Sequence, residues 1–187
     1  MKRILLLVMT LTLSGSLFAQ SAGADKFPKG SRVLVAYFSA SGVTESAAQK
    51  LAAVVNGDLY AIEPATPYSA ADLDWHNAQS RSSVEMNNPA ARPALANLNA
   101  HIENYDVIFI GYPIWWYTAP RIINSFVEAY SFTGKMIVPF ATSGSSTIEQ
   151  SVTDLSKSYP DIKWTPGLLL NGATEQTIRQ QLEQRVW

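Results

Sequence analysis

The sequence predicts an α/β protein with a parallel β-sheet covered by helices on both faces. Strand and helix patterns alternate about five times along the chain. Two strand patterns, RVLVAYF at 32–38 and DVIFIG at 106–111, are almost continuously apolar, as in strands that are buried on both faces. Parallel neighbours need crossover connections, and amphipathic helices between the strands supply them. The length of 187 residues suits a single domain.

The first three expected elements are a strand, a helix and a strand. The strand at 32–38 is followed at once by a helical pattern at 44–55. Its apolar face carries Ala47, Ala48, Leu51, Ala52 and Val55. Asn56 and Gly57 predict the end of this helix, because both residues tolerate the left-handed conformation. Residues 58–62 predict the second strand.

The excursion, residues 63–93, is polar and punctuated by prolines. We expect a helix over about 70–86 within it, and a brief helical approach at 95–102. The remaining strands are expected at 106–111, 135–140 and 164–170, and the remaining helices at 120–130, 147–156 and 174–186. In the helix at 120–130, the inward-facing residues are expected to be Ile122, Ile123, Phe126 and Val127.

The first 24 residues differ in character from the rest. Two basic residues precede an apolar run at 4–13, and small residues follow it. This order is typical of a secretory signal peptide, with cleavage after Ala19 or Ala24. An uncleaved membrane anchor is the alternative, although the apolar run is short for a span. We expect residues 1–24 to be removed and residues 25–187 to form an exported, periplasmic domain without a membrane span.

The composition argues against several classes of function. A net charge of −1 without clustered Lys and Arg argues against nucleic-acid binding. No cysteine is present, so neither a disulfide nor a lipid-modified cysteine can form. His76 and His101 lack neighbours at metal-ligand spacing, so we expect no metal site. The GxSxG elbow of serine hydrolases is also missing.

The hydroxyl turn, residues 39–44 (SASGVT), connects the first strand directly to a helix. In parallel sheets ligands bind beyond the carboxyl ends of the strands. Unpaired N–H groups at a helix start, together with hydroxyl donors, favour an anion such as a monophosphate. Gly42 allows the backbone to approach such a ligand closely. A nucleotide-triphosphate motif is absent. The alternative is a plain strand–helix turn with Thr44 as helix cap.

Two further loops follow strands and are expected beside this turn. GYPIWWYTAP at 111–120 places four aromatic residues within six, and such residues can wall a flat ring system. The alternative is that the two tryptophans pack in the core or in an interface. The third loop, residues 141–146 (ATSGSS), supplies small side chains and backbone donors that would rim the same cleft.

These three motifs in this order resemble the flavodoxin-like FMN-binding proteins, most nearly the bacterial flavodoxin-family branch with a PIWW loop. The resemblance covers essentially the whole mature chain. It implies a three-layer sandwich with a five-stranded parallel sheet in the order 2-1-3-4-5, for which flavodoxin is a known example. It places the FMN phosphate on Ser39, Ala40, Ser41, Gly42, Val43 and Thr44. It places the isoalloxazine against Pro113, Ile114, Trp115, Trp116 and Tyr117, with a rim of Thr142, Ser143 and Gly144.

The resemblance implies that the chemistry takes place on the flavin, so we expect no catalytic acid or base among the side chains. Three functions stay open: an electron carrier with a redox partner protein, an NAD(P)H-dependent reductase of a quinone or similar small acceptor, and a non-redox FMN-binding module. Ala141 stands where many relatives have a cysteine. Removal of residues 1–24 takes away Lys2 and Arg3 and leaves 12 basic against 15 acidic side chains, a net charge of −3. This charge steers basic partners only weakly.

Overall fold

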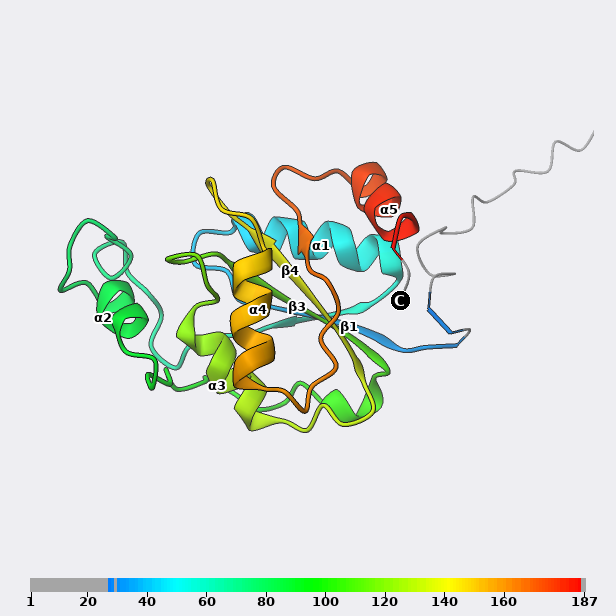
Figure 1. The fold of residues 1–187 in the computed structure, drawn as a ribbon, viewed down its shortest axis with the longest axis horizontal. Helices are drawn as coiled ribbons and strands as arrows, with labels where there is room; N and C mark the ends of the chain where they lie inside the picture. The colour runs from blue at the N-terminus through cyan, green and yellow to red at the C-terminus, as the bar shows by residue number, and fades with distance from the viewer. Residues whose placement is uncertain (1–26, 29, 186–187) are drawn as a thin grey trace, which may run out of the picture.

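The computed structural model describes residues 27–28 and 30–185, so the predicted signal peptide and its cleavage sites lie outside the described residues. Within this part of the chain, no helix is long and apolar enough to cross a membrane. The elements follow in the order β1 (Val33–Tyr37), α1 (Val43–Val55), β2 (Asp58–Ala61), α2 (Arg81–Asn87), the 3₁₀ helix η2 (Ile102–Asn104), β3 (Val107–Pro113), α3 (Arg121–Ala129), β4 (Met136–Thr142), α4 (Glu149–Ser158), β5 (Leu168–Leu169) and α5 (Glu175–Glu183) (Figure 1).

The five strands form one parallel sheet in the order β2-β1-β3-β4-β5, which confirms the predicted topology. The chain moves from β1 outward to β2 and then crosses back to β3 on the other side of β1. Strand order therefore reverses between β1 and β3. The loops that leave the carboxyl ends of these two strands flank the position where such sheets bind ligands.

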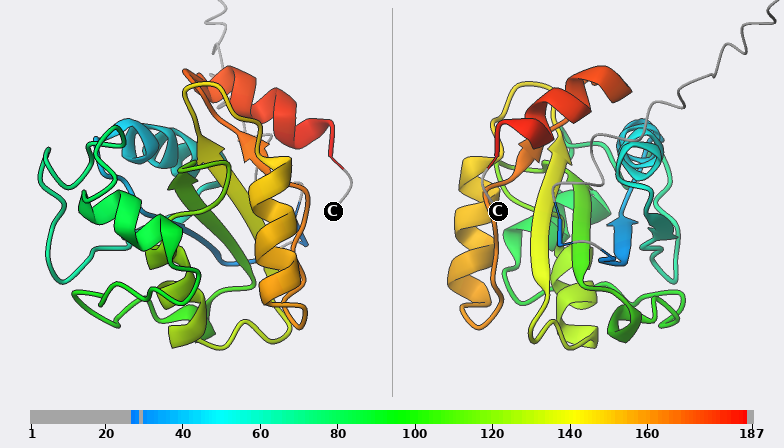
Figure 2. Two further views of the ribbon diagram at one scale, coloured as in Figure 1. Left: turned by 60° about the vertical axis from the view of Figure 1, so that its left-hand side comes forward. Right: turned by 90° about the vertical axis from the view of Figure 1, so that its right-hand side faces the viewer.

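Helices cover both faces of the sheet, and each face has its own core (Figures 1 and 2). On one face α1 and α5 pack over inward residues of the strands such as Val35 and Phe109. On the other face α3 and α4 pack over residues such as Ile108 and Ile110. The continuous apolar runs of β1 and β3 are explained by this arrangement, because alternate residues enter opposite cores. The predicted inward faces of α1 and α3 are confirmed as buried.

The start of α1 differs from the capped turn considered as an alternative. Gly42 is the N-cap residue, with a left-handed φ of 82° and no side-chain cap bond. Thr44 lies inside the helix and its hydroxyl bonds elsewhere, so it is not the cap. The predicted helix end is confirmed: Asn56 has a φ of 50°, and the Gly57 N–H donates to the Ala52 carbonyl at 3.0 Å.

The helix predicted over 70–86 is wrong for most of its length, since α2 covers only Arg81–Asn87. Polar side chains hold the preceding residues in turns instead. The Asp72 carboxylate accepts from the Ser69 N–H, and the Asp74 carboxylate accepts from the His76 N–H. Such local side-chain bonds compete with helical ones. Ser80 then caps α2 by accepting from the Ser83 N–H.

The helical approach expected at 95–102 is also wrong, because this segment mostly lacks regular secondary structure and only η2 at its end is helical. Leu95 bridges Pro64: the Ala65 N–H donates to the Ala94 carbonyl and the Ala96 N–H to the Glu63 carbonyl, both at 2.8 Å. These bonds hold the two ends of the excursion together. The excursion and α2 stand out from the sheet in Figure 1.

Strand lengths change at the edge of the sheet where the site is expected. β3 and β4 each run two residues further than predicted, so Pro113 and Thr142 are strand ends that pair with each other. The last predicted strand, 164–170, shrinks to β5 plus an isolated bridge between Trp164 and Ile137. Pro166 interrupts it, because proline has no N–H to donate to the ladder.

Candidate functional site

The hydroxyl turn presents unpaired donors at the carboxyl end of β1. The Ser39 hydroxyl oxygen is buried and has no hydrogen-bond partner among the described residues. The Ser46 N–H donates back to the Gly42 carbonyl at 3.0 Å, so the amides of residues 43–45 precede the first helical bond. A Cβ added at Gly42 would meet no atom within 4 Å. The turn therefore has open space beside the positive end of α1, which suits an anion.

Two cavities flank the hydroxyl turn. Ser39 and Ala40 line one of about 460 Å³, which also receives Tyr37, Glu45 and Glu63. Burial, with the neighbouring Glu45 carboxylate, raises the pKa of the Tyr37 hydroxyl. Residues 41–43 line the other, of about 410 Å³.

Lys50 lines this second cavity and donates to the Ala173 carbonyl at 3.1 Å. The sequence analysis missed this cation because Lys50 lies on α1, outside the hydroxyl turn. The signal was present in the helical spacing, because Lys50 follows Gly42 and Ser46 at intervals of four residues on α1.

The aromatic turn, residues 115–118, is a tight two-residue hairpin. The Trp115 N–H donates to the Thr118 carbonyl and the Thr118 N–H to the Trp115 carbonyl, both at 3.0 Å. Between them Trp116 and Tyr117 have φ angles of 47° and 66°. This is the pattern of a type I′ turn, which strongly favours glycine and asparagine. Two aromatic residues in left-handed conformations are strained, and such strain clusters at functional sites.

The two tryptophans face different surroundings. Trp115 is half-buried and meets Phe38 and Tyr68 edge-on, with ring centroids 5.6 Å and 5.4 Å away. Trp116 remains 42% exposed and Tyr117 70% exposed. Trp115 therefore packs against the core, as the alternative interpretation of the two tryptophans expects. Trp116 and Tyr117 keep surface available for a ligand.

Thr142 joins the third loop to the hydroxyl turn. Its hydroxyl lies 2.8 Å from the Thr44 hydroxyl, and both residues are buried. Its carbonyl accepts from the Ile114 N–H at 2.9 Å, which ties the aromatic loop to the same strand end. Thr142 therefore contacts both neighbouring loops, although its side chain does not line the cleft described below.

The amides of the third loop are largely occupied. The Ser143 N–H donates to the Asn171 side-chain carbonyl at 2.7 Å. The Ser143 hydroxyl accepts from the N–H groups of Ser146, at 2.8 Å, and Ser145, at 3.3 Å. Several backbone donors expected for a ligand thus stabilise the loop itself. Asn171 was missed by the sequence analysis, since it lies on the neighbouring connection after β5.

The aromatic cleft is an open cavity of about 480 Å³ between the aromatic turn and the third loop. Its lining comprises residues 114–117, residues 143–146, and Leu73, Trp75 and Ser82. It thus brings together Ile114, Trp115, Trp116 and Tyr117 from the aromatic loop and Ser143 and Gly144 from the third loop. Pro113 and the hydroxyl turn do not line it. The three residues from the excursion were missed, although a tryptophan in a polar segment was a usable signal.

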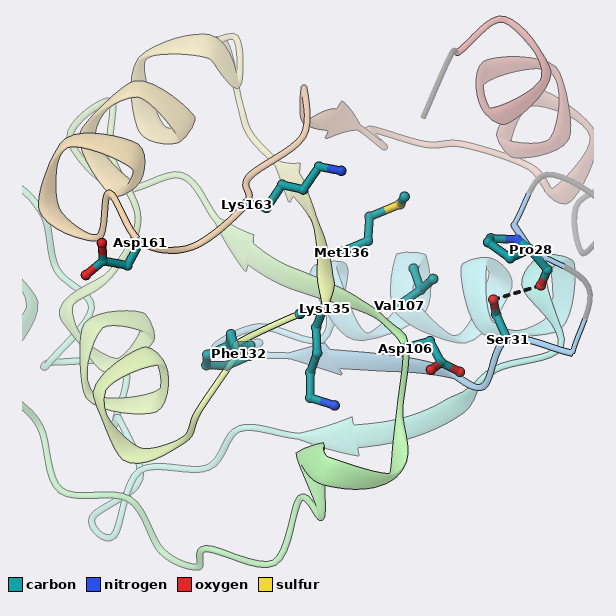
Figure 3. Close-up of a pocket in the computed structure, with 10 residues that line it drawn as sticks. Pro28, Ser31, Asp106, Val107, Phe132, Lys135, Met136, Asp161 and Lys163 are labelled. Atoms are coloured by element: carbon teal, nitrogen blue, oxygen red, sulfur yellow. Dashed lines mark hydrogen bonds between the residues drawn. The ribbon is translucent and has the colours of Figure 1, made fainter.

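A further cavity of about 450 Å³ lies at the opposite edge, near the amino ends of β3 and β4 (Figure 3). Two of the charged residues that line it have partners: Lys135 donates to the Tyr105 carbonyl at 2.5 Å, and the Asp106 carboxylate accepts from the Arg32 N–H at 2.8 Å. It is remote from the three loops. Among the described residues no group of His, Asp and Glu could hold a metal ion.

Comparison with known proteins decides the family. The profile of the family described as flavodoxin matches residues 32–185, which span all five strands and all three loops. The chain belongs to the flavodoxin family. This membership supports FMN as its cofactor. A comparison with curated proteins finds no match.

Two solved structures are close relatives of this flavodoxin-family chain. A candidate flavoprotein from Bacteroides eggerthii is 59% identical, with a TM-score of 0.80, covering 82% of this chain and 96% of that one. Another from Bacteroides uniformis is 52% identical, with a TM-score of 0.81 and coverage of 83% and 100%. A flavoprotein from Lactobacillus acidophilus, solved in complex with FMN, is 18% identical with a TM-score of 0.60, and covers 82% and 99%. This last likeness shows the fold.

Proposed function

We propose that this flavodoxin-family protein transfers electrons through one non-covalently bound FMN. The observation that carries the proposal is the arrangement at the switch point. A helix-starting turn with an unpartnered hydroxyl, Ser39, lies beside an uncharged aromatic cleft, and the buried Thr44–Thr142 bond connects the two. A molecule with a phosphate at one end and a flat ring at the other would use both.

The residues of the hydroxyl turn fit the phosphate end. The hydroxyls of Ser39 and Ser41, together with the amides of residues 43–45, supply neutral donors. Gly42 leaves the approach open. Lys50 contributes positive charge from the adjacent cavity without entering the turn. A dianion held by neutral donors at a helix start needs no arginine or lysine in direct contact.

The aromatic cleft fits the ring end. Trp116 offers an exposed indole as a stacking surface, and the contacts of Trp115 with Phe38 and Tyr68 hold the turn in place. Ser143 and Gly144 would form the opposite rim. When bound, FMN would supply the redox chemistry itself. The chain's residues would orient the ring, exclude water from one face and set its electrostatic surroundings.

Export is a second part of the proposal. The order of charged, apolar and small residues in 1–24 supports a cleaved signal peptide. Intact-mass analysis of protein recovered from the cell envelope should give a chain that begins at Gln20 or Asp25. A full-length mass in the soluble cytoplasmic fraction would contradict the proposed export.

The functional test is electron delivery by the FMN-loaded protein. After chemical reduction, the protein should pass electrons to an added acceptor, either a haem protein or a quinone. Delivery without NADPH oxidation supports a carrier, whereas steady NADPH oxidation with added quinone selects a reductase. Failure to deliver electrons to either acceptor would leave a binding module and contradict the proposed electron transfer.

A further inference from the structure

We propose that Asn171 is a site of spontaneous deamidation, which replaces a neutral anchor of the third loop with a negatively charged one. In this reaction the backbone nitrogen of Gly172 attacks the side-chain amide carbon of Asn171. The nitrogen gives up its proton, ammonia leaves, and a cyclic imide forms. Water then opens the imide to aspartate or to isoaspartate. The reaction needs only water, so the modification itself does not rest on the proposed function.

The chain contains two Asn–Gly pairs, Asn56–Gly57 and Asn171–Gly172. Such pairs are prone to this reaction, because glycine has no Cβ to hinder attack by its nitrogen and its backbone can take the conformation that ring closure requires. The first pair ends α1, and the second lies in the connection between β5 and α5. The sequence alone does not distinguish the two pairs, whereas their surroundings in the fold do.

The pair Asn56–Gly57 is protected. The Gly57 N–H donates to the Ala52 carbonyl at 3.0 Å, so the attacking nitrogen is engaged in the end of the helix. A Cβ added at Gly57 would lie 3.1 Å from the Val33 carbonyl oxygen and 3.2 Å from the Val55 side chain. These close contacts leave the backbone little room to turn towards the Asn56 side chain. Attack at this pair therefore requires the end of α1 to open first.

The pair Asn171–Gly172 is open. Both residues are exposed, and the Gly172 N–H has no hydrogen-bond partner among residues 27–28 and 30–185. A Cβ added at Gly172 would meet no atom within 4 Å. Gly172 also lines the open cavity of about 410 Å³ beside the hydroxyl turn, so water reaches this pair. The nitrogen is free to attack, and the backbone has space to move.

The Asn171 side chain is also activated for attack. Its carbonyl oxygen accepts from the Ser143 N–H at 2.7 Å. Attack by the Gly172 nitrogen places negative charge on this oxygen, and a donor held against it stabilises that charge. The Ser143 N–H therefore acts on the Asn171 amide as an oxyanion-hole donor acts on a substrate carbonyl.

Deamidation would change the site that the third loop helps to form. Either product carries a carboxylate at position 171, and isoaspartate adds one backbone carbon, which moves the acceptor away from the Ser143 N–H. Ser143 and Gly144 line the aromatic cleft. This consequence rests on the proposed function: loss of one hydrogen bond that holds the rim should weaken FMN binding about two- to tenfold.

The test follows freshly purified mature protein during storage at mildly alkaline pH, by peptide mass mapping and an isoaspartate assay. The peptide with Asn171 should gain the mass that separates an acid from an amide at least about tenfold faster than the peptide with Asn56. In urea the two rates should converge, because the difference belongs to the fold. Asn171→Gln is the matched control, since glutamine keeps the amide and closes such a ring far more slowly.

Equal rates at both pairs in the folded protein, or an unchanged Asn171 peptide when both pairs react in urea, would overturn the inference. FMN titration then compares stored with fresh protein, for the parent and for Asn171→Gln. Weaker binding by the stored parent alone supports the consequence for the site, and equal losses in both proteins contradict it. Failure of the fresh parent to bind FMN would contradict the proposed function, while the two deamidation rates would still decide the inference.

Discussion

Thr44 and Thr142 share a buried hydrogen bond of 2.8 Å between their hydroxyl groups, across 98 positions of sequence. Thr44 belongs to the first turn of α1, and Thr142 ends β4. The bond therefore fixes the distance between the hydroxyl turn and the third loop. These loops are proposed to hold opposite ends of one cofactor, so this pair connects the stability of the fold to the geometry of the site.

Removal of both hydroxyls should destabilise the protein by less than the two single removals added together. Thr142→Val leaves the Thr44 hydroxyl buried without a partner, which lowers the free energy of unfolding by about 1–3 kcal/mol. The double variant Thr44→Val with Thr142→Val should lose less than the sum of the single losses. Urea denaturation of the four apoproteins measures the coupling. Strictly additive losses would mean that the bond does not contribute.

Gly42→Val should weaken FMN binding without unfolding the sheet. No atom lies within 4 Å of the added Cβ, so the effect comes from the left-handed φ of 82° and from the ligand. One or two lost hydrogen bonds to the phosphate reduce affinity roughly ten- to a hundredfold each. Gly134→Val is the matched control, because Gly134 has a φ of 75°, equally open surroundings and a place at the opposite edge of the sheet.

Both glycine variants should lower the melting temperature through the same backbone strain, and only Gly42→Val should change the FMN dissociation constant. Fluorescence quenching of FMN gives that constant. Equal FMN affinity in the two variants would mean that the hydroxyl turn does not bind the phosphate.

Trp115→Ala and Trp116→Ala should affect different properties. Trp115 packs against Phe38 and Tyr68, so its removal should lower the free energy of unfolding by up to about 3 kcal/mol. Trp116 is exposed in the aromatic turn, so its removal should weaken FMN binding by about 0.5–1.5 kcal/mol and leave apoprotein melting nearly unchanged. Paired FMN titrations and melts test this division. If both variants bind FMN like the parent, the aromatic turn is packing alone.

Alkaline pH should destabilise the fold in part through Tyr68. Burial, with the hydrogen bond to the Glu85 carboxylate, raises the pKa of the Tyr68 hydroxyl above its ordinary value. The folded state therefore keeps this proton more tightly than the unfolded state. The resulting stability is fully present below the ordinary pKa near 10 and is lost as pH rises towards the raised value.

Denaturant unfolding of the parent and Tyr68→Phe across about pH 9 to pH 11 measures this contribution. The parent should lose more stability over that range than the variant, because phenylalanine has no proton to release. Parallel pH dependence of the two proteins would refute a role for Tyr68. Other tyrosines with raised pKa values are common to both proteins and cancel in the comparison.

The layered fold was accessible from the sequence because its signals are local. The continuous apolar run of β1 indicates a strand that is buried on both faces. The one-sided apolar pattern of α1 indicates a helix that is buried on one face. Asn56 marked the end of α1 for the reason that it forms it, since it takes the left-handed conformation there. Strand order came from family resemblance, because parallel pairing partners are distant in sequence.

The missed features depend on long-range or competing interactions. The prediction of a helix over 70–86 was wrong because the Asp72 and Asp74 carboxylates accept hydrogen bonds from nearby backbone N–H groups. Helix propensities do not show whether such local bonds or helical bonds are the more stable. A division of roles between the two tryptophans is expected from the sequence, but which of them packs inward is set by a type I′ turn that lacks the usual glycine or asparagine. Leu73 and Trp75 line the aromatic cleft because the excursion folds back over it, and no local sequence pattern specifies that fold.

Titration of purified mature apoprotein with FMN, followed by absorbance and flavin fluorescence, tests directly whether this chain holds the flavin. Binding should saturate at one FMN per chain, with a shifted flavin spectrum and with flavin fluorescence quenched by the stacked indole of Trp116. FMN should bind more weakly to the Gly42→Val variant and normally to the Gly134→Val variant. An unchanged flavin spectrum and unquenched fluorescence at every protein concentration would contradict FMN binding by this chain.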